Sequence, residues 1–182
     1  MQTNPTIQAL LKGEIDAAII ASHPVESQLQ GDTLYYEQFF GYVSPKESIF
    51  KNELIRTSDI NGERLWLLDE GHCFRDQLMR FCQMEKVKVR QSAYRLGSME
   101  TFMRMVESGN GITFIPELAV DQLGQEQRML VRPFAIPKPA REIALVTRKD
   151  FVRHTISEIL IQSVRKSVPK EMHSLQPYEK VV

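Results

Sequence analysis

Short apolar segments of strand length alternate along this chain with segments whose apolar residues recur at helical spacing. A strand buried on both faces is a continuous apolar run, whereas a helix lying on a sheet carries one apolar stripe. The alternation therefore predicts an α/β fold with parallel sheets and helices on both faces. The predicted strands are residues 17–20, 34–36, 39–43, 65–68, 87–89, 112–115 and 143–147, and the predicted helices are 7–11, 74–84, 98–107, 116–123 and 152–168.

Two proline-flanked stretches, near residues 40–45 and 133–139, divide the chain. We interpret them as paired crossings between two lobes, because 182 residues are enough for one substantial domain or for two small lobes. The first lobe would combine residues 1–40 with 138–182, and the second would comprise residues 41–137.

The composition excludes several classes of protein. Lys plus Arg and Asp plus Glu are balanced at 23 each, whereas domains that grip nucleic acid by themselves are usually basic. No apolar run approaches the roughly 18 residues of a membrane span, and no basic segment with an apolar core marks a signal peptide. Two cysteines are too few for a secreted disulfide scaffold. We therefore expect a cytoplasmic protein with reduced thiols, and a frayed polar tail over residues 170–182.

The two cysteines, Cys73 and Cys82, stand nine residues apart. Cys73 follows a predicted strand and begins a predicted helix, and Cys82 lies near the far end of that helix. Nine helical residues span about 13 Å, whereas a disulfide needs Cα atoms within about 7 Å. The thiols are therefore either unrelated, as two buried core residues, or able to pair only if the helix unwinds.

Cys73 has the setting of a reactive thiol. The start of a helix carries partial positive charge, and His72 and Arg75 lie beside the cysteine; each of these lowers a thiol pKa and favours the thiolate that attacks peroxide. A zinc site is not supported, because no two histidines stand at ligand spacing. A Cys-His hydrolase would need a histidine near Cys73 in space and a carboxylate to orient it, and the adjacent His72 is poorly placed to act as the base. We expect no metal and no cofactor, and we interpret residues 109–111 as a turn between helix and strand.

The segment 71–77, with Cys82 beyond it, resembles the OxyR family of peroxide-sensing LysR-type transcription regulators. The resemblance covers roughly residues 3–168. It continues through residues 13–16, 98–101, 109–113, 116–120 and 141–148.

This resemblance implies two Rossmann-like lobes joined by two crossover strands, as in periplasmic binding proteins. It implies that Cys73 is the peroxide-reactive cysteine and that Cys82 is the resolving cysteine. It further implies a peroxide pocket lined by Thr3, His72 and Arg141, and a regulator rather than an enzyme.

The resemblance also implies partners. The family forms homodimers or dimers of dimers, binds DNA through an N-terminal domain, is reset by a thiol reductant such as glutaredoxin or thioredoxin, and acts on RNA polymerase. No such domain precedes Met1, so we expect DNA binding only in a longer protein and an N-terminally incomplete first lobe. The apolar residues of the helix that carries Cys82 predict a homodimer contact on this helix or on the strand after it.

Two alternatives stay open. The chain could be a LysR-type domain that binds a small-molecule effector between its lobes, with incidental cysteines. It could also be a catalytic thiol peroxidase, which would turn over many peroxides with a thiol reductant.

Overall fold

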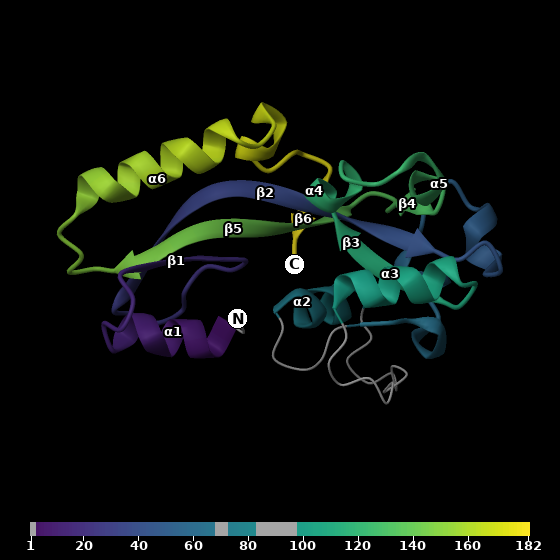
Figure 1. The fold of residues 1–182 in the computed structure, drawn as a ribbon, viewed down its shortest axis with the longest axis horizontal. Helices are drawn as coiled ribbons and strands as arrows, with labels where there is room; N and C mark the ends of the chain where they lie inside the picture. The colour runs from purple at the N-terminus through teal and green to yellow at the C-terminus, as the bar shows by residue number, and fades with distance from the viewer. Residues whose placement is uncertain (1–2, 68–72, 83–97) are drawn as a thin grey trace. The chain divides into compact units, whose positions relative to one another are not determined.

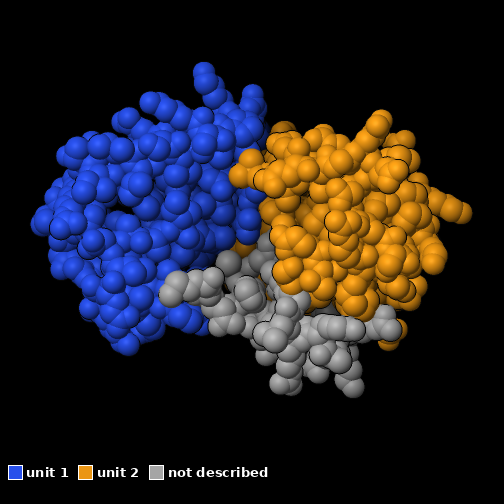
Figure 2. All heavy atoms as spheres, in the orientation of Figure 1, with its two compact units in different colours: residues 1–37, 141–177, 181 blue, residues 38–140, 178–180, 182 orange. Residues whose placement is uncertain are grey.

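A computed structural model describes residues 3–67, 73–82 and 98–182 of the chain (Figure 1). The chain divides into two compact units, which Figure 2 colours blue and orange. Unit 1 comprises Met1–Glu37, Arg141–Pro177 and Val181, and unit 2 comprises Gln38–Ala140, Tyr178–Lys180 and Val182.

Unit 1 is a sheet with a helix on each face. Strand β1 (Ala17–Ile20) pairs antiparallel with β5 (Lys138–Arg148), from Ala17 opposite Thr147 to Ile20 opposite Ala144. Helix α1 (Thr3–Leu11) covers one face through Ile7 and Leu10, and helix α6 (His154–Lys166) covers the other through Ile161 and Val164 (Figure 1). Alternate side chains of β5 pack on the two faces of the sheet, as expected for the period of two in a strand.

Two long strands pass from one unit into the other. β2 (Leu29–Val43) leaves unit 1 and β5 returns to it, and both belong to a sheet of order β1-β5-β2-β3. The prediction of parallel sheets is wrong for the strand pairs described. The ladders β1–β5, β2–β3 and β2–β4 are antiparallel, and parallel pairing occurs as the single bridges Ile55–Phe134 and Leu65–Ile112. Strand β5 returns to unit 1 in the direction opposite to β1, so the two strands pair antiparallel. The alternation of strands and helices in the sequence predicts parallel pairing instead.

Unit 2 is built around β2, β3 (Ile112–Pro116) and β4 (Val131–Pro133). Alternate residues of β2 enter two different apolar clusters. Phe39 and Val43 belong to the cluster on which α2 (Cys73–Phe81) packs, and Tyr42 belongs to the cluster that receives α3 (Met99–Glu107). The remaining elements of this unit are short: η1 (Ser48–Lys51), η2 (Thr57–Asp59), η3 (Gly62–Arg64), α4 (Glu117–Val120), α5 (Gln125–Arg128) and β6 (Glu179–Val181).

Several predicted elements differ from those observed. Residues 65–67 form one bridge rather than a full strand, and β4 occupies part of the stretch interpreted as a connection. The predicted strand at 87–89 lies outside the described residues. The predicted frayed tail is wrong: it contains η4 (Lys170–His173) and β6, Met172 is buried, and Val182 packs against the core of unit 2. The end of the chain therefore contributes to unit 2 as well as to unit 1.

Within the described part of the chain, no helix is both long and apolar enough to cross a membrane.

Candidate functional site

The predicted helix that carries both cysteines is present from Cys73 to Phe81. Cys73 is its first residue, and Cys82 closes its last turn by donating its backbone N–H to the Leu78 carbonyl at 2.9 Å. Leu78 is buried, and Phe81 packs edge-on against Phe134 with ring centroids 5.7 Å apart. These contacts dock the C-terminal half of α2 on the core of unit 2.

Cys82 is a free thiol buried in that core, only 7% exposed. It belongs to the same apolar cluster as Leu78, Ile55 and Phe114. Burial disfavours the charged thiolate and raises the pKa of the Cys82 thiol to about 12. In the described conformation this cysteine is therefore a protonated core residue, as expected for a buried free cysteine.

Cys73 is placed by its backbone at the first position of α2. Its side chain and residue His72 lie outside the described residues, so the neighbourhood of this thiol stays a prediction.

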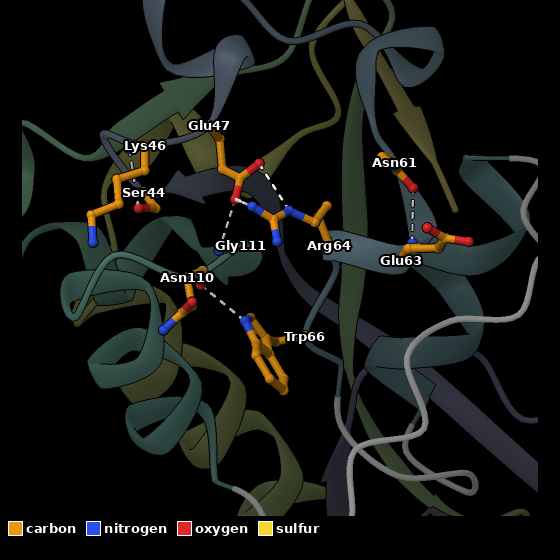
Figure 3. A network of polar contacts seen from close by, with 9 residues as sticks. All are labelled: Ser44, Lys46, Glu47, Asn61, Glu63, Arg64, Trp66, Asn110 and Gly111. Atoms are coloured by element: carbon orange, nitrogen blue, oxygen red, sulfur yellow. Dashed lines mark hydrogen bonds and ion pairs between the residues drawn. The ribbon is translucent and has the colours of Figure 1, made fainter.

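The segment leading toward Cys73 is held firmly at its start. Trp66 donates its backbone N–H to the Ile112 carbonyl at 2.8 Å, and its own carbonyl accepts from the Thr113 hydroxyl at 3.0 Å. The Trp66 indole N–H donates to the Asn110 carbonyl at 2.9 Å (Figure 3). These bonds fix residues 65–66 beside the start of β3.

Glu47 fixes the turn at residues 109–111, which directly precedes β3. Its Oε1 accepts from the Gly111 N–H at 3.0 Å and lies 3.0 Å from Arg64 Nη2 (Figure 3). Gly111 has a φ of +70°, and a Cβ at this position would stand 2.3 Å from the Arg64 carbonyl oxygen, so only glycine fits. The prediction that residues 109–111 form a helix-to-strand turn is confirmed.

Arg141 is held by a buried carboxylate in unit 1. Its Nε and Nη2 both donate to Glu37 Oε2, at 2.8 and 2.7 Å, and Glu37 is 2% exposed. Burial raises the pKa of Tyr35, Glu37 raises it further, and Arg141 opposes them. Sequence reasoning missed Glu37, although an acidic residue inside an apolar strand signals a partner.

Thr3 is the first residue of α1. Thr3 and Arg141 both belong to unit 1, and the third predicted pocket residue, His72, is outside the described residues. No group of three His, Cys, Asp or Glu side chains that could hold a metal ion occurs among the residues the structure describes.

Comparison with known proteins gives consistent matches. Residues 1–169 match the model of the LysR substrate binding domain. A hydrogen peroxide-inducible genes activator of Dickeya chrysanthemi is 33% identical over 174 residues, which cover 96% of this chain and 57% of that protein. The DNA-binding transcriptional dual regulator OxyR of Escherichia coli K12 is 30% identical over 164 residues, which cover 90% of this chain and 53% of that protein. The chain thus spans about half the length of these curated relatives.

A solved structure gives a higher identity. The crystal structure of reduced OxyR from Porphyromonas gingivalis is 53% identical, with a TM-score of 0.91, and the match covers all of this chain and 83% of that one. The α/β architecture is accordingly the two-lobed, periplasmic-binding-protein-like fold of such regulatory domains.

Proposed function

Because the chain belongs to the LysR substrate-binding domains, in their OxyR group, we propose that it is the hydrogen-peroxide-sensing regulatory domain of a transcription regulator. The observation that carries this proposal is the placement of two cysteines at opposite ends of one short helix, with the second thiol buried in the core. The relatives named above as peroxide-inducible activators support the same function.

The proposed chemistry converts two thiols and one peroxide into a disulfide and two waters. The Cys73 thiolate attacks one peroxide oxygen, the O–O bond breaks, and the departing hydroxide takes a proton to become water. The Cys82 sulfur then attacks the sulfenic sulfur of Cys73, the S–O bond breaks, and a second water leaves. Two electrons from a thiol reductant such as glutaredoxin or thioredoxin restore both thiols.

The helix must unwind for the second step. At 1.5 Å per residue, nine helical residues separate the two Cα atoms by about 13 Å, roughly twice the span that a disulfide tolerates. Cys82 must also leave the apolar cluster, because its thiol is protonated there at neutral pH. Formation of the disulfide would therefore trap α2 in an unwound, repacked state, which is the conformational signal of the switch.

We assign the peroxide pocket to Thr3, His72 and Arg141, following the family resemblance. Arg141 supports this role because two of its N–H groups are fixed by Glu37, which orients the guanidinium. A guanidinium oriented in this way can hydrogen-bond a peroxide oxygen while it accumulates charge.

We further propose that the chain self-associates through α6. The described apolar residues of α2 turn inward: Leu78 is buried, and Met79 and Phe81 pack against the core of unit 2. Exposed apolar side chains instead gather on α6, on the loop before it and on β1, and contiguous exposed apolar surface marks interaction sites. These residues are Ile19, Val152, Ile156, Ile159 and Leu160. From the family resemblance we also propose DNA and RNA polymerase as partners of the protein.

Thiol mass analysis before and after one equivalent of hydrogen peroxide tests the switch. We expect the wild-type chain to lose two hydrogens, and peptide mapping to join Cys73 to Cys82. Cys82→Ser should stop at a sulfenic acid on residue 73 that a cyclic 1,3-dione captures. Cys73→Ser is the matched control and should stay reduced. Oxidation of Cys73→Ser at the wild-type rate would contradict the assignment.

The match to a substrate-binding family favours a second candidate, a domain that binds a small metabolite between its lobes. A metabolite that raises the melting temperature of Cys73→Ser, in a chain that also fails the peroxide test, would establish this alternative. Sustained consumption of peroxide with a thiol reductant would instead indicate a thiol peroxidase.

A further inference from the structure

Unit 2 contains a pocket of about 260 Å³ at the C-terminal end of α2. Its walls come from four separate segments of the chain. They are residues 55–57, Phe81, residues 134–137 and Lys180. The volume is slightly below the roughly 300–1,000 Å³ of pockets for drug-sized ligands, so the pocket suits a small molecule.

One side of the pocket is apolar and firmly built. Ile55 and Phe134 are buried and form a parallel bridge, in which Ala135 donates to the Ile55 carbonyl at 2.8 Å. Phe81 adds a ring that meets Phe134 edge-on. This wall offers aromatic and aliphatic contact to an apolar ligand body.

The pocket is also lined by two positively charged residues, Arg56 and Lys180. Both residues are exposed, and neither forms an ion pair with another residue of the described part of the chain. Two acidic residues stand three positions from Arg56: Asp59 accepts the Arg56 backbone N–H at 3.0 Å, and Glu53 does not line the pocket. The neighbour of Lys180, Glu179, accepts from the Gln38 amide at 2.7 Å, which holds β6 in place.

A pocket lined by apolar side chains together with Arg56, Thr57 and Lys180 suits one chemical class. We propose that this pocket binds a small organic carboxylate, whose apolar body lies against Phe81 and Phe134 and whose carboxylate meets Arg56 and Lys180. A guanidinium pairs with a carboxylate through two parallel hydrogen bonds, and Lys180 adds a second positive charge.

The ligand would also control the helix that carries the cysteines. Phe81 is the last residue of α2 and directly precedes Cys82, so unwinding of α2 removes one wall of the pocket. A ligand that binds only the docked form of α2 lowers the population of the open form by the factor 1 + [ligand]/Kd. The bound carboxylate therefore opposes exposure of Cys82. This regulatory part rests on the proposed redox switch, whereas the binding site does not.

Binding is tested with phenylacetate, using phenylacetamide as the uncharged analogue, on the ¹⁵N-labelled reduced chain. We expect phenylacetate to shift the backbone resonances of Thr57, Ala135 and Lys180, and phenylacetamide to bind about tenfold more weakly, because its amide carries no negative charge to pair with the two cations. The double variant Arg56→Gln/Lys180→Gln should bind phenylacetate about tenfold more weakly than the wild type does. Lys51→Gln/Lys149→Gln, which removes two exposed charges that do not line the pocket, should bind like wild type. Unmoved pocket resonances, or equal binding by the Arg56/Lys180 variant, would overturn the site.

Coupling is tested by the rate at which an alkylating agent modifies Cys82 in Cys73→Ser, a variant that cannot form the disulfide. At ten times its dissociation constant for the wild type, phenylacetate should slow modification about elevenfold, whereas the Arg56/Lys180 variant, which binds about tenfold more weakly, should show only about a twofold slowing at the same concentration. An unchanged rate despite saturated binding would overturn the control of α2. Since this readout requires no peroxide, failure of the peroxide chemistry is seen separately, in the thiol mass analysis of the wild-type chain.

Discussion

Helices α2 and α3 of unit 2 have the same length, nine residues, but differ in what they bury. The inner side of α2 combines the apolar Leu78 with the amide of Gln77 and the thiol of Cys82, and all three are buried. The buried residues of α3 are all apolar: Phe102, Met103 and Val106.

The ends of α3 are also fixed by hydrogen bonds. The Ser98 hydroxyl accepts from the Thr101 N–H at 3.3 Å, and at the other end Ser108 and Gly109 donate to the carbonyls of Arg104 and Val106.

The difference indicates which helix can open by itself. Full burial of a Phe, Met or Val side chain is worth roughly 1.5–3 kcal/mol, whereas burial of a polar group offsets part of the gain. Elements that rearrange are drawn from the low-stability end of a structure. The less apolar docking of α2 therefore suits a helix that must unwind, and the docking of α3 suits a fixed scaffold.

Truncation of the two docking residues should separate local from global opening. Phe102→Ala should lower the free energy of unfolding by about 3–5 kcal/mol, measured by urea denaturation. Leu78→Ala should lower the free energy of opening α2 by at least about 2 kcal/mol, and so raise the rate of Cys82 alkylation at least about thirtyfold. Provided that it stays folded, Phe102→Ala should change this alkylation rate far less.

If both variants speed Cys82 alkylation by the factor that their global destabilisation predicts, α2 opens only with the whole unit. The comparison between the two helices would then fail, and the disulfide would have to form from a globally unfolded state. Ile115→Val, a mild truncation in the same cluster as Phe102, controls for general loosening of the core.

Alkaline pH should weaken the docking of α2 through Cys82. Burial raises the thiol pKa to about 12, whereas in the unfolded chain it stays near 8.5–9. Between these values the unfolded chain has lost the proton and the folded chain keeps it, so stability falls as pH rises. The free energy of unfolding of the wild type, relative to Cys82→Ala, should fall by about 1.4 kcal/mol for each pH unit above about 9.

The measurement is urea denaturation of both proteins at several pH values under reducing conditions. Lys and Tyr residues titrate equally in both, so their contributions cancel in the difference. A constant difference from pH 8 to pH 10.5 would show that Cys82 is already solvated in the native state.

Much of this fold follows from apolar periodicity in the sequence. The α3 and α6 helices and the β1 and β3 strands are found close to their predicted residues, because one buried stripe or run defines each. Helix α1 and strand β5 include their predicted residues but begin four and five residues earlier, at Thr3 and Lys138. The sheet direction was predicted incorrectly, because periodicity does not encode which way a returning strand runs. The C-terminal strand was missed because polar residues such as Glu179 and Lys180 gain their order from pairing with distant residues.

The site was predictable only where it is local in sequence. Helix α2 and the core position of Cys82 follow from nearby apolar residues. The pairing of Arg141 with Glu37 spans 104 residues, and the pocket beside Phe81 needs Lys180 from a strand that the sequence did not reveal. Such contacts depend on tertiary structure, which local patterns do not specify.

The smallest expected effect concerns the N-terminal cap of α3. Ser98→Ala removes the acceptor of the Thr101 N–H and should lower the free energy of unfolding by about 1 kcal/mol. Ser98→Asp keeps an acceptor at the same position and should restore most of the loss. Because α3 is the fixed helix in this comparison, neither change should alter the rate of Cys82 alkylation under native conditions. A several-fold faster alkylation in Ser98→Ala, reversed in Ser98→Asp, would show that the start of α3 is energetically linked to α2, and that the two helices open as one unit.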